Sequence, residues 1–186
     1  INYVDTGDSS YNAYSALING IAVCSGYTEC FKTLLDMLGI ENATISVEAG
    51  GQQHIWNVVN LDNHWYHVDV TWDDPVGSSS NYIDHSYFNI SADDMALDHT
   101  WDRSRYSAYE KCGAKYSYCR YKKLPLISNV NQLNKLIYST VKNKTAHIEF
   151  TTTYNADLKE AISRTGQQLS YSYKNIDRVI YILIDI

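Results

Sequence analysis

The stretches VCSGYTECFKTLLDMLGI (residues 23–40) and HIWNVVNLDNHWYHVDV (residues 54–70) decide the expected fold. Apolar residues of the first stretch recur at the spacing of a helix: Tyr27, Phe31, Leu34, Leu35 and Leu38. This spacing predicts a buried helix that begins near Cys24 and stops at Gly39. The helix thus carries a cysteine at its first turn.

The second stretch has the alternation of a β-hairpin. Two alternating runs flank Asp62 and Asn63, and both of these residue types tolerate the positive φ that a two-residue turn requires. We predict strands at about 54–61 and 64–71, preceded by another β-rich run at 43–49. The helix and the hairpin together predict a helix packed on an antiparallel sheet.

A second, smaller unit is expected after Leu124, where the pattern changes. Helices are predicted at 129–141 and 156–166, and strands at 146–154, 168–173 and 178–186. We therefore expect an α+β chain of two domains, 1–110 and 124–186, in which the second is a small α/β unit of unknown role.

Composition excludes several classes of function. The net charge of −6 and the lack of a long Lys/Arg run argue against nucleic acid as a partner. Apolar runs are only a handful of residues long, so we expect no segment that spans a bilayer core of ~30 Å. The chain opens at Ile1 without an initiator Met, and we expect a processed or truncated piece that lacks its targeting signal.

Cys24 is the candidate nucleophile. Unpaired N–H groups at a helix N-terminus favour the negative charge of a thiolate, and the predicted helix places Cys24 there. The competing interpretation is a small buried core residue, which we expect for Cys30 in the same helix. Position alone does not decide between the two.

The hairpin register supplies a candidate base. If Asp62 and Asn63 form the turn, paired residue numbers sum to 125, and His54 and Asp69 become diagonal neighbours on one face, about 5–8 Å apart. A carboxylate there would fix the tautomer of the imidazole and leave its other nitrogen for a thiol. The same register puts Trp56 beside both residues. The alternative is a solvated His and Asp on a half-exposed strand face.

Three separated motifs resemble the transglutaminase-like family, in which Cys, His and Asp motifs occur in this order. They are the helix motif around Cys24, HIWNVVNLDNHWYHVDVTWDDP at 54–75 and YFNISADDMALDHTW at 87–101, and the likeness extends over about residues 11–103. Ile55 stands where the family usually has Ala, and Asn63 where Gly often follows Asp. Neither departure removes a catalytic group.

The resemblance implies a papain-like core in which Cys24, His54 and Asp69 form a catalytic triad and Trp56 contacts the substrate. It implies thiol-dependent amide hydrolysis or acyl transfer on a protein or cell-wall peptide, through an acyl-enzyme and without a cofactor. The backbone N–H of Cys24 is the natural first oxyanion donor, and the sequence does not assign a second. The alternative is a non-catalytic cell-surface binding or scaffold module with the same fold.

A metal hydrolase is a further alternative, because several possible ligands lie within a stretch shorter than half of the chain: His54, His64, His67, Asp69, His85 and His99. His64 and His67 differ by three on a strand and point to opposite faces, so we expect no metal site. The acidic pairs at 73–74 and 93–94 lack the spacing of a Ca²⁺ loop.

Cys112 and Cys119 lie in the short segment KCGAKYSYC, which a disulfide could close. A disulfide there would imply an oxidising compartment, whereas two thiols would imply nothing about location. Together with the family resemblance, the bridge leads us to expect a bacterial protein that is secreted or held at the cell surface.

Overall fold

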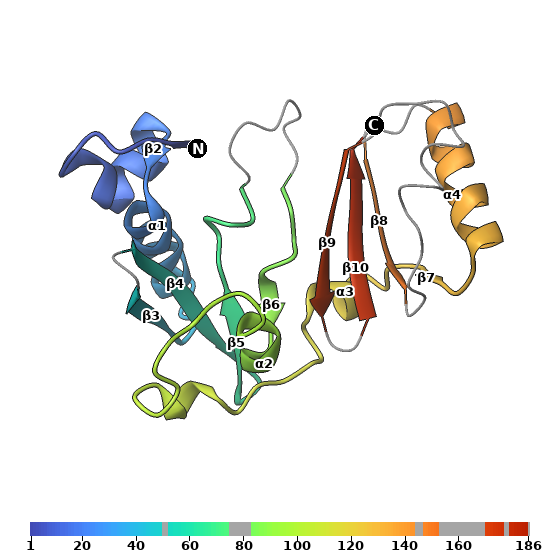
Figure 1. The fold of residues 1–186 in the computed structure, drawn as a ribbon. Helices are drawn as coiled ribbons and strands as arrows, with labels where there is room; N and C mark the ends of the chain where they lie inside the picture. Colours follow the sequence, from blue (N-terminus) through green and yellow to red (C-terminus); the bar gives the residue numbers. More distant parts are fainter. Residues whose placement is uncertain (50–51, 75–82, 144–146, 153–169, 177–178, 186) are drawn as a thin grey trace. The chain divides into compact units, whose positions relative to one another are not determined.

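Two units, Ile1–Tyr118 and Cys119–Ile186, make up the chain in the computed structural model (Figure 1). The structure describes residues 1–49, 52–74, 83–143, 147–152, 170–176 and 179–185. Each unit combines helices with a four-stranded sheet, which confirms a mixed chain of the α+β kind. No helix within these ranges has the length and apolar character needed to cross a membrane.

The first unit is built on an antiparallel sheet with the order β3, β4, β5, β6. These strands are β3 (Asn42–Ala49), β4 (Gln52–Leu61), β5 (His64–Val68) and β6 (Phe88–Ile90). The sheet is preceded by β1 (Asn2–Tyr3), η1 (Ser9–Tyr11), the π-helix η2 (Ser15–Asn19), β2 (Ile21–Ala22) and α1 (Cys24–Met37). It is followed by α2 (Ala92–Met95) and η3 (Ser107–Tyr109). Figure 1 shows α1 lying along β3 and β4.

Buried polar contacts fix α1 against β4. The Thr28 hydroxyl donates to the carbonyl of Ile55 at 2.9 Å, and the Asn57 amide donates to the carbonyl of Thr28 at 3.1 Å. Thr28 and Asn57 are fully buried, so losing either partner would leave polar groups without water. The first turns of the helix are thereby held beside the strand that carries His54.

The buried face of α1 differs from the predicted one at Leu34 and Leu38, which are exposed. Tyr27 and Cys30 instead pack against two alanines of the preceding segment, Ala16 and Ala22. The segment before the helix therefore covers one side of its first turns, while Leu35 and Phe31 face the sheet. Leu34 and Leu38 lie on the remaining side of the last turns, where they are exposed.

The predicted hairpin is confirmed. Asp62 and Asn63 have φ of 53° and 60°, and the pairs Asn57↔Val68 and Leu61↔His64 keep the expected register. The second strand nevertheless ends at Val68 rather than at residue 71. It ends there because the Asp69 carboxylate accepts hydrogen bonds from backbone N–H groups two and three residues ahead, which bends the chain into a turn.

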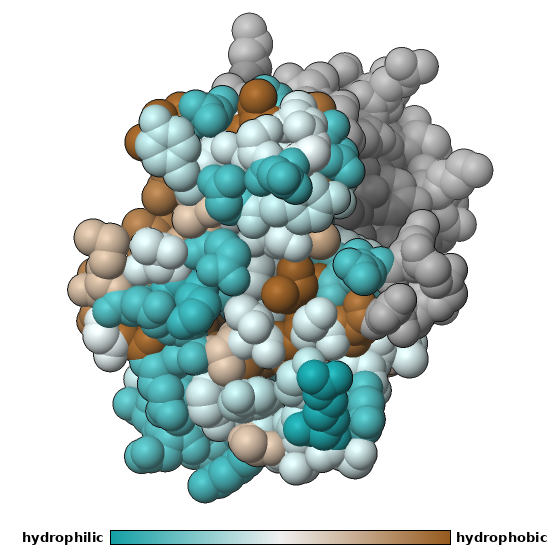
Figure 2. Space-filling model, turned by 90° about the vertical axis from the view of Figure 1, so that its left-hand side faces the viewer, coloured by the Kyte–Doolittle hydropathy of each residue, from teal (hydrophilic) through white to brown (hydrophobic). Residues whose placement is uncertain are grey.

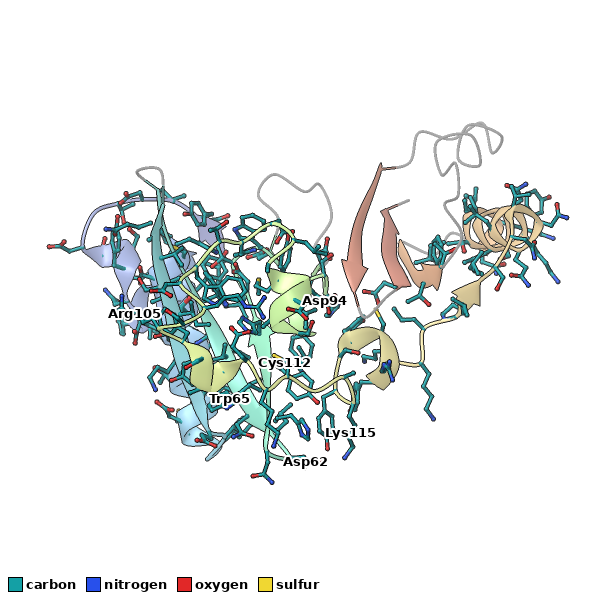
Figure 3. The ribbon with its side chains drawn as sticks, turned by 60° about the horizontal axis from the view of Figure 1, so that its bottom comes forward. Asp62, Trp65, Asp94, Arg105, Cys112 and Lys115 are labelled. Carbon is teal, nitrogen blue, oxygen red and sulfur yellow. The ribbon has the colours of Figure 1, made fainter. Side chains whose placement is uncertain are left out.

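A later segment packs against this hairpin (Figure 3). The Lys115 ammonium lies 2.7 Å from the Asp62 carboxylate at the hairpin tip, where the Tyr116 hydroxyl also donates. Trp65 of β5 donates its backbone N–H to the carbonyl of Lys111 and accepts from the N–H of Gly113. The chain after η3 thus closes over the open side of the hairpin.

The second unit has the sheet order β7, β8, β10, β9. Its elements are β7 (Leu126–Ile127), α4 (Val130–Asn143), β8 (His147–Thr152), β9 (Ser170–Ile176) and β10 (Val179–Asp185), and the short α3 (Tyr118–Tyr121) precedes them. α4 buries Leu133 and Ile137, and Phe150 of β8 is also fully buried. The predicted helix at 129–141 and the three predicted strands are present, whereas the predicted helix at 156–166 lies outside the described residues.

We expect Asn63→Gly to stabilise the first unit by about 0.5–1 kcal/mol, because Asn63 is exposed at positive φ and glycine adopts this conformation without a steric penalty. Asn63→Ala is the matched control, and it should destabilise the protein because a Cβ disfavours this region. Urea unfolding of both variants measures the effect. Equal stability of the two variants would contradict the importance of this turn.

Candidate functional site

Cys24 is the first residue of α1 and lies at its unpaired N-terminus. Val23 is extended, and its N–H donates to the carbonyl of Ser10 at 3.0 Å. A Cβ on Gly26 would approach that same carbonyl to 2.6 Å, so the first helical turn packs directly against the Ser10 backbone. The Cys24 side chain is held at this junction with an exposed fraction of 9%.

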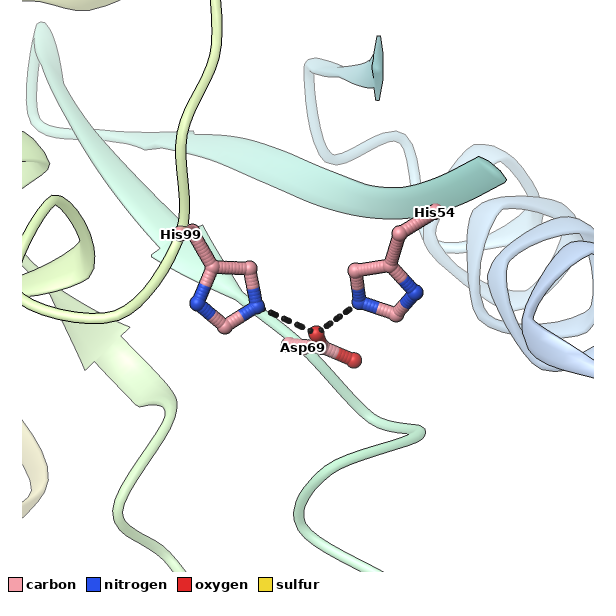
Figure 4. A group of neighbouring side chains, drawn as sticks. All are labelled: His54, Asp69 and His99. Carbon is pink, nitrogen blue, oxygen red and sulfur yellow. Dashed lines mark hydrogen bonds and ion pairs between the residues drawn. The ribbon is translucent and has the colours of Figure 1, made fainter. Parts of the chain in front are cut away.

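His54 and Asp69 lie on one face of the hairpin, as the register predicted. His54 Nε2 and Asp69 Oδ2 are 2.5 Å apart (Figure 4), and the aspartate is buried while the imidazole is partly exposed. With Nε2 on the carboxylate, Nδ1 remains for the thiol, and His54 is close enough to Cys24 to lower the pKa of that thiol. The structure therefore brings all three predicted residues together.

The electrostatics of the pair favour a thiolate and an imidazolium. Burial raises the pKa of the Cys24 thiol, but hydrogen bonding to His54, the charge of its ring and nearby backbone N–H groups bring it below the ordinary 9.0. Burial lowers the pKa of His54, but hydrogen bonds to Asp69 and Cys24 raise it to about 9. Both shifts favour the thiolate–imidazolium ion pair over the neutral pair.

The Asp69 carboxylate accepts four hydrogen bonds although it is fully buried. Oδ1 accepts from the N–H groups of Thr71 at 3.0 Å and Trp72 at 3.1 Å, and Oδ2 accepts from His54 and His99. Burial raises the pKa of Asp69, but the two imidazoles outweigh it and the net pKa is lowered. The carboxylate therefore stays ionised and fixed in orientation.

His99 is the residue of this site that motif reasoning did not assign to the triad. Its Nε2 lies 3.1 Å from Asp69 Oδ2 and its Nδ1 lies 2.7 Å from Asp98 Oδ1. Both ring nitrogens face carboxylates, so both must carry a proton for the two contacts to be hydrogen bonds. Burial lowers the pKa of His99, but its bonds to Asp69 and Asp98 raise it above the ordinary 6.5. The sequence feature that indicates this role is the pair Asp98-His99 within the motif at 87–101.

His54, Asp69 and His99 also satisfy the spacing of a metal-binding group, since their ligand atoms lie within 4.8 Å of one another. Those atoms are hydrogen-bonded to each other through the single oxygen Asp69 Oδ2, and we interpret the group as a hydrogen-bond network. His67 is separate from the group. Its Nδ1 accepts from the Trp56 indole at 3.0 Å, and burial lowers its pKa to about 3, so it is neutral.

The acidic pairs bind protein donors. Asp74 accepts from the Tyr27 hydroxyl at 2.6 Å, and Asp73 accepts from the N–H of Tyr87 at 2.8 Å. Asp93 lies 2.9 Å from the Arg103 guanidinium, and the Asp94 carboxylate accepts from the hydroxyl of its N-cap serine, Ser91, at 2.7 Å. These contacts give each carboxylate a role within the fold.

Trp56 does not fulfil its predicted role in substrate contact, because its exposed fraction is 0%. Trp56 does lie beside His54, as the register predicted, with a distance of 5.9 Å between ring centroids. Its ring also lies 5.1 Å from that of His99, in the interior of the first unit. Trp72 is the exposed indole of the site. Its exposed fraction is 43%, and its ring lies 5.8 Å from that of His54 and 4.3 Å from that of His99.

The expected disulfide between Cys112 and Cys119 is not formed, since both residues are thiols in the structure. The Cys112 sulfur accepts a hydrogen bond from the N–H of Ala92 at 3.1 Å, and burial raises the pKa of its thiol. A buried thiol with its own backbone partner serves as a packing residue. The disulfide therefore no longer supports the expected extracellular location.

One family model matches part of the chain. The family model of the transglutaminase-like superfamily matches residues 1–70. This match agrees with the resemblance over residues 1–70, a segment that contains Cys24, His54 and Asp69. No curated protein matches the chain at a significant level.

We expect His99→Ala to lower the free energy of unfolding by about 3 kcal/mol, because it removes one of the two imidazoles that hold the buried Asp69 carboxylate. The pKa of His99 is raised on folding, so its contribution is complete below pH 6.5 and is lost as pH rises through the raised pKa. The difference from wild type should therefore be largest near pH 6 and shrink in alkali.

Urea unfolding across a pH series measures this difference. His64→Ala, at the partly exposed start of β5, is the matched histidine control and should change stability only slightly. A stability difference for His99→Ala that grows with rising pH would contradict a cationic His99.

Proposed function

We propose that the chain is a thiol-dependent enzyme of the papain-like kind, which hydrolyses amides or transfers acyl groups through a covalent acyl-enzyme. The arrangement of Cys24 at a helix N-terminus, His54 beside it and a buried Asp69 behind the imidazole carries this proposal. Cysteine-dependent acyl transfer or hydrolysis is also what the superfamily match suggests. The substrate we propose is a protein or cell-wall peptide.

The proposed reaction begins from the ion pair. The Cys24 thiolate attacks an amide carbonyl, so a C–S bond forms and the carbonyl oxygen takes the negative charge. The His54 imidazolium then gives its proton to the leaving amine as the C–N bond breaks. Water or a second amine, deprotonated by His54, attacks the thioester and releases the product with regeneration of the thiolate.

Asp69 and His99 hold the base, His54, in its orientation. The carboxylate holds His54 Nε2 and therefore directs Nδ1 at the thiol, while His99 and the two N–H donors keep the carboxylate from turning. His99 also adds a positive charge to the Asp69 side of the network, and Asp98 balances it. We assign His99 as a positioning residue.

The same thiol chemistry suits an extracellular peptide, and the family resemblance supports a secreted or surface location. Trp72, exposed beside His54, is the aromatic surface that a substrate would meet. Whether water or an amine accepts the acyl group depends on what reaches the thioester.

Alkylation of the thiol decides between an enzyme and an inert scaffold. We expect iodoacetamide at about pH 6 to modify Cys24 first, because its lowered pKa leaves it ionised where ordinary thiols are protonated. His54→Ala should slow this reaction, since both the hydrogen bond and the positive charge are lost. Peptide mass spectrometry across a pH series measures the rate at each cysteine.

Cys30 in the same helix is the internal control, because burial raises the pKa of its thiol and it should resist until the protein unfolds. Should Cys24 react no faster than a model thiol at every pH, the thiolate is not activated. The non-catalytic binding or scaffold module would then be the better assignment.

Substrate turnover can be measured with a peptide pool by mass spectrometry, with and without a primary amine. Hydrolysis would add water to an acyl product, and transfer would add the amine instead. We expect Asp69→Asn to lower turnover by ~10³- to 10⁴-fold with the fold intact, because an amide favours the wrong imidazole tautomer. Wild-type turnover in that variant would reduce Asp69 to a structural residue.

A further inference from the structure

The tyrosine of β1 is held beside the nucleophile by strand pairing. β1 pairs in parallel with β2, with Asn2 opposite Ile21 and Tyr3 opposite Ala22, two residues before Cys24. The N–H of Val4 donates to the carbonyl of Ala22 at 3.2 Å and fixes this register. Figure 1 shows these first strands at the N-terminal end of α1.

Tyr3 reaches the backbone of the nucleophile itself. The backbone N–H of Cys24 acts on its phenol and lowers the phenol pKa, and its ring lies 6.5 Å from that of Tyr27 in the first turn of α1. Tyr27 is buried in the first turn of α1 and donates its hydroxyl to the carbonyl of Ile1, which steadies the same strand. Tyr3 as a whole residue keeps an exposed fraction of 43%.

We propose that the Tyr3 hydroxyl is the second oxyanion donor of the site, next to the N–H of Cys24. This inference rests on the proposed function and adds a catalytic residue to it. When the thiolate attacks, the C–S bond forms and the carbonyl π electrons move to oxygen. That oxygen takes over the Cys24 N–H from the phenol, and the Tyr3 O–H turns to donate to it. The phenol keeps its proton throughout.

The charge state of Tyr3 agrees with this role. Burial and the neighbouring Cys24 thiolate raise the pKa of Tyr3, so its hydroxyl is protonated at neutral pH and has a proton to donate. The groups that most lower the pKa of Cys24 are His54 and the backbone N–H groups of Ile55 and Ser25. Removal of the hydroxyl should therefore change acylation without changing thiolate formation.

Two reactions of the same thiol separate these effects in the chain of residues 1–186. Acylation by p-nitrophenyl acetate builds an oxyanion, whereas displacement of iodide from iodoacetamide does not. We expect Tyr3→Phe to slow single-turnover release of p-nitrophenolate, by on the order of 100-fold as for loss of one oxyanion donor, with alkylation of Cys24 unchanged.

Tyr11→Phe is the matched control. Tyr11 has an exposed fraction of 46% near the same cysteine, but its hydroxyl donates to Asp5 at 3.1 Å. It should acylate and alkylate as the wild type does, and thermal melts check that both variants fold.

Each outcome has one meaning. Fast alkylation of the wild type with equal acylation in Tyr3→Phe would overturn the oxyanion role and leave the proposed enzyme standing. Faster acylation in Tyr3→Phe would also overturn it, because the phenol would then block the site. Slow alkylation of Cys24 in the wild type would instead count against the proposed function itself.

Discussion

The hydrogen bond between the buried Asp69 carboxylate and His54 is the interaction on which the site depends. One oxygen of this carboxylate holds both imidazoles, and the other ends β5 by accepting two backbone N–H groups. The same side chain thus terminates the strand and orients the base. A buried carboxylate is stable only with such a complete set of partners, so the local fold and the site impose the same requirement.

Charge is distributed along a chain of alternating groups. The thiolate of Cys24, the imidazolium of His54, the carboxylate of Asp69, the imidazolium of His99 and the carboxylate of Asp98 follow one another in contact. Each charge has an opposite neighbour, which offsets the cost of burying it. Within the network, the His54 and Asp98 side chains are partly exposed, whereas Asp69 and His99 are buried.

The surroundings of the site come from segments that are distant in sequence. The N-terminal strand brings Tyr3 to the first turn of α1, the hairpin brings His54, and the stretch after β6 brings His99. Polar and apolar residues mix in small patches over the face of the first unit drawn in Figure 2. Aromatic rings fill the space around the imidazoles, with Trp56 inside and Trp72 outside.

The sequence by itself determined the hairpin and the helix, because both depend on local rules. The turn residues at Asp62 and Asn63 set the register, and that register alone put His54 and Asp69 on one face. Only the tertiary structure decided which indole is buried, that Cys112 serves packing, and that His99 joins Asp69 from 30 residues away. These outcomes depend on contacts between distant segments, and such contacts leave no periodic pattern in the sequence.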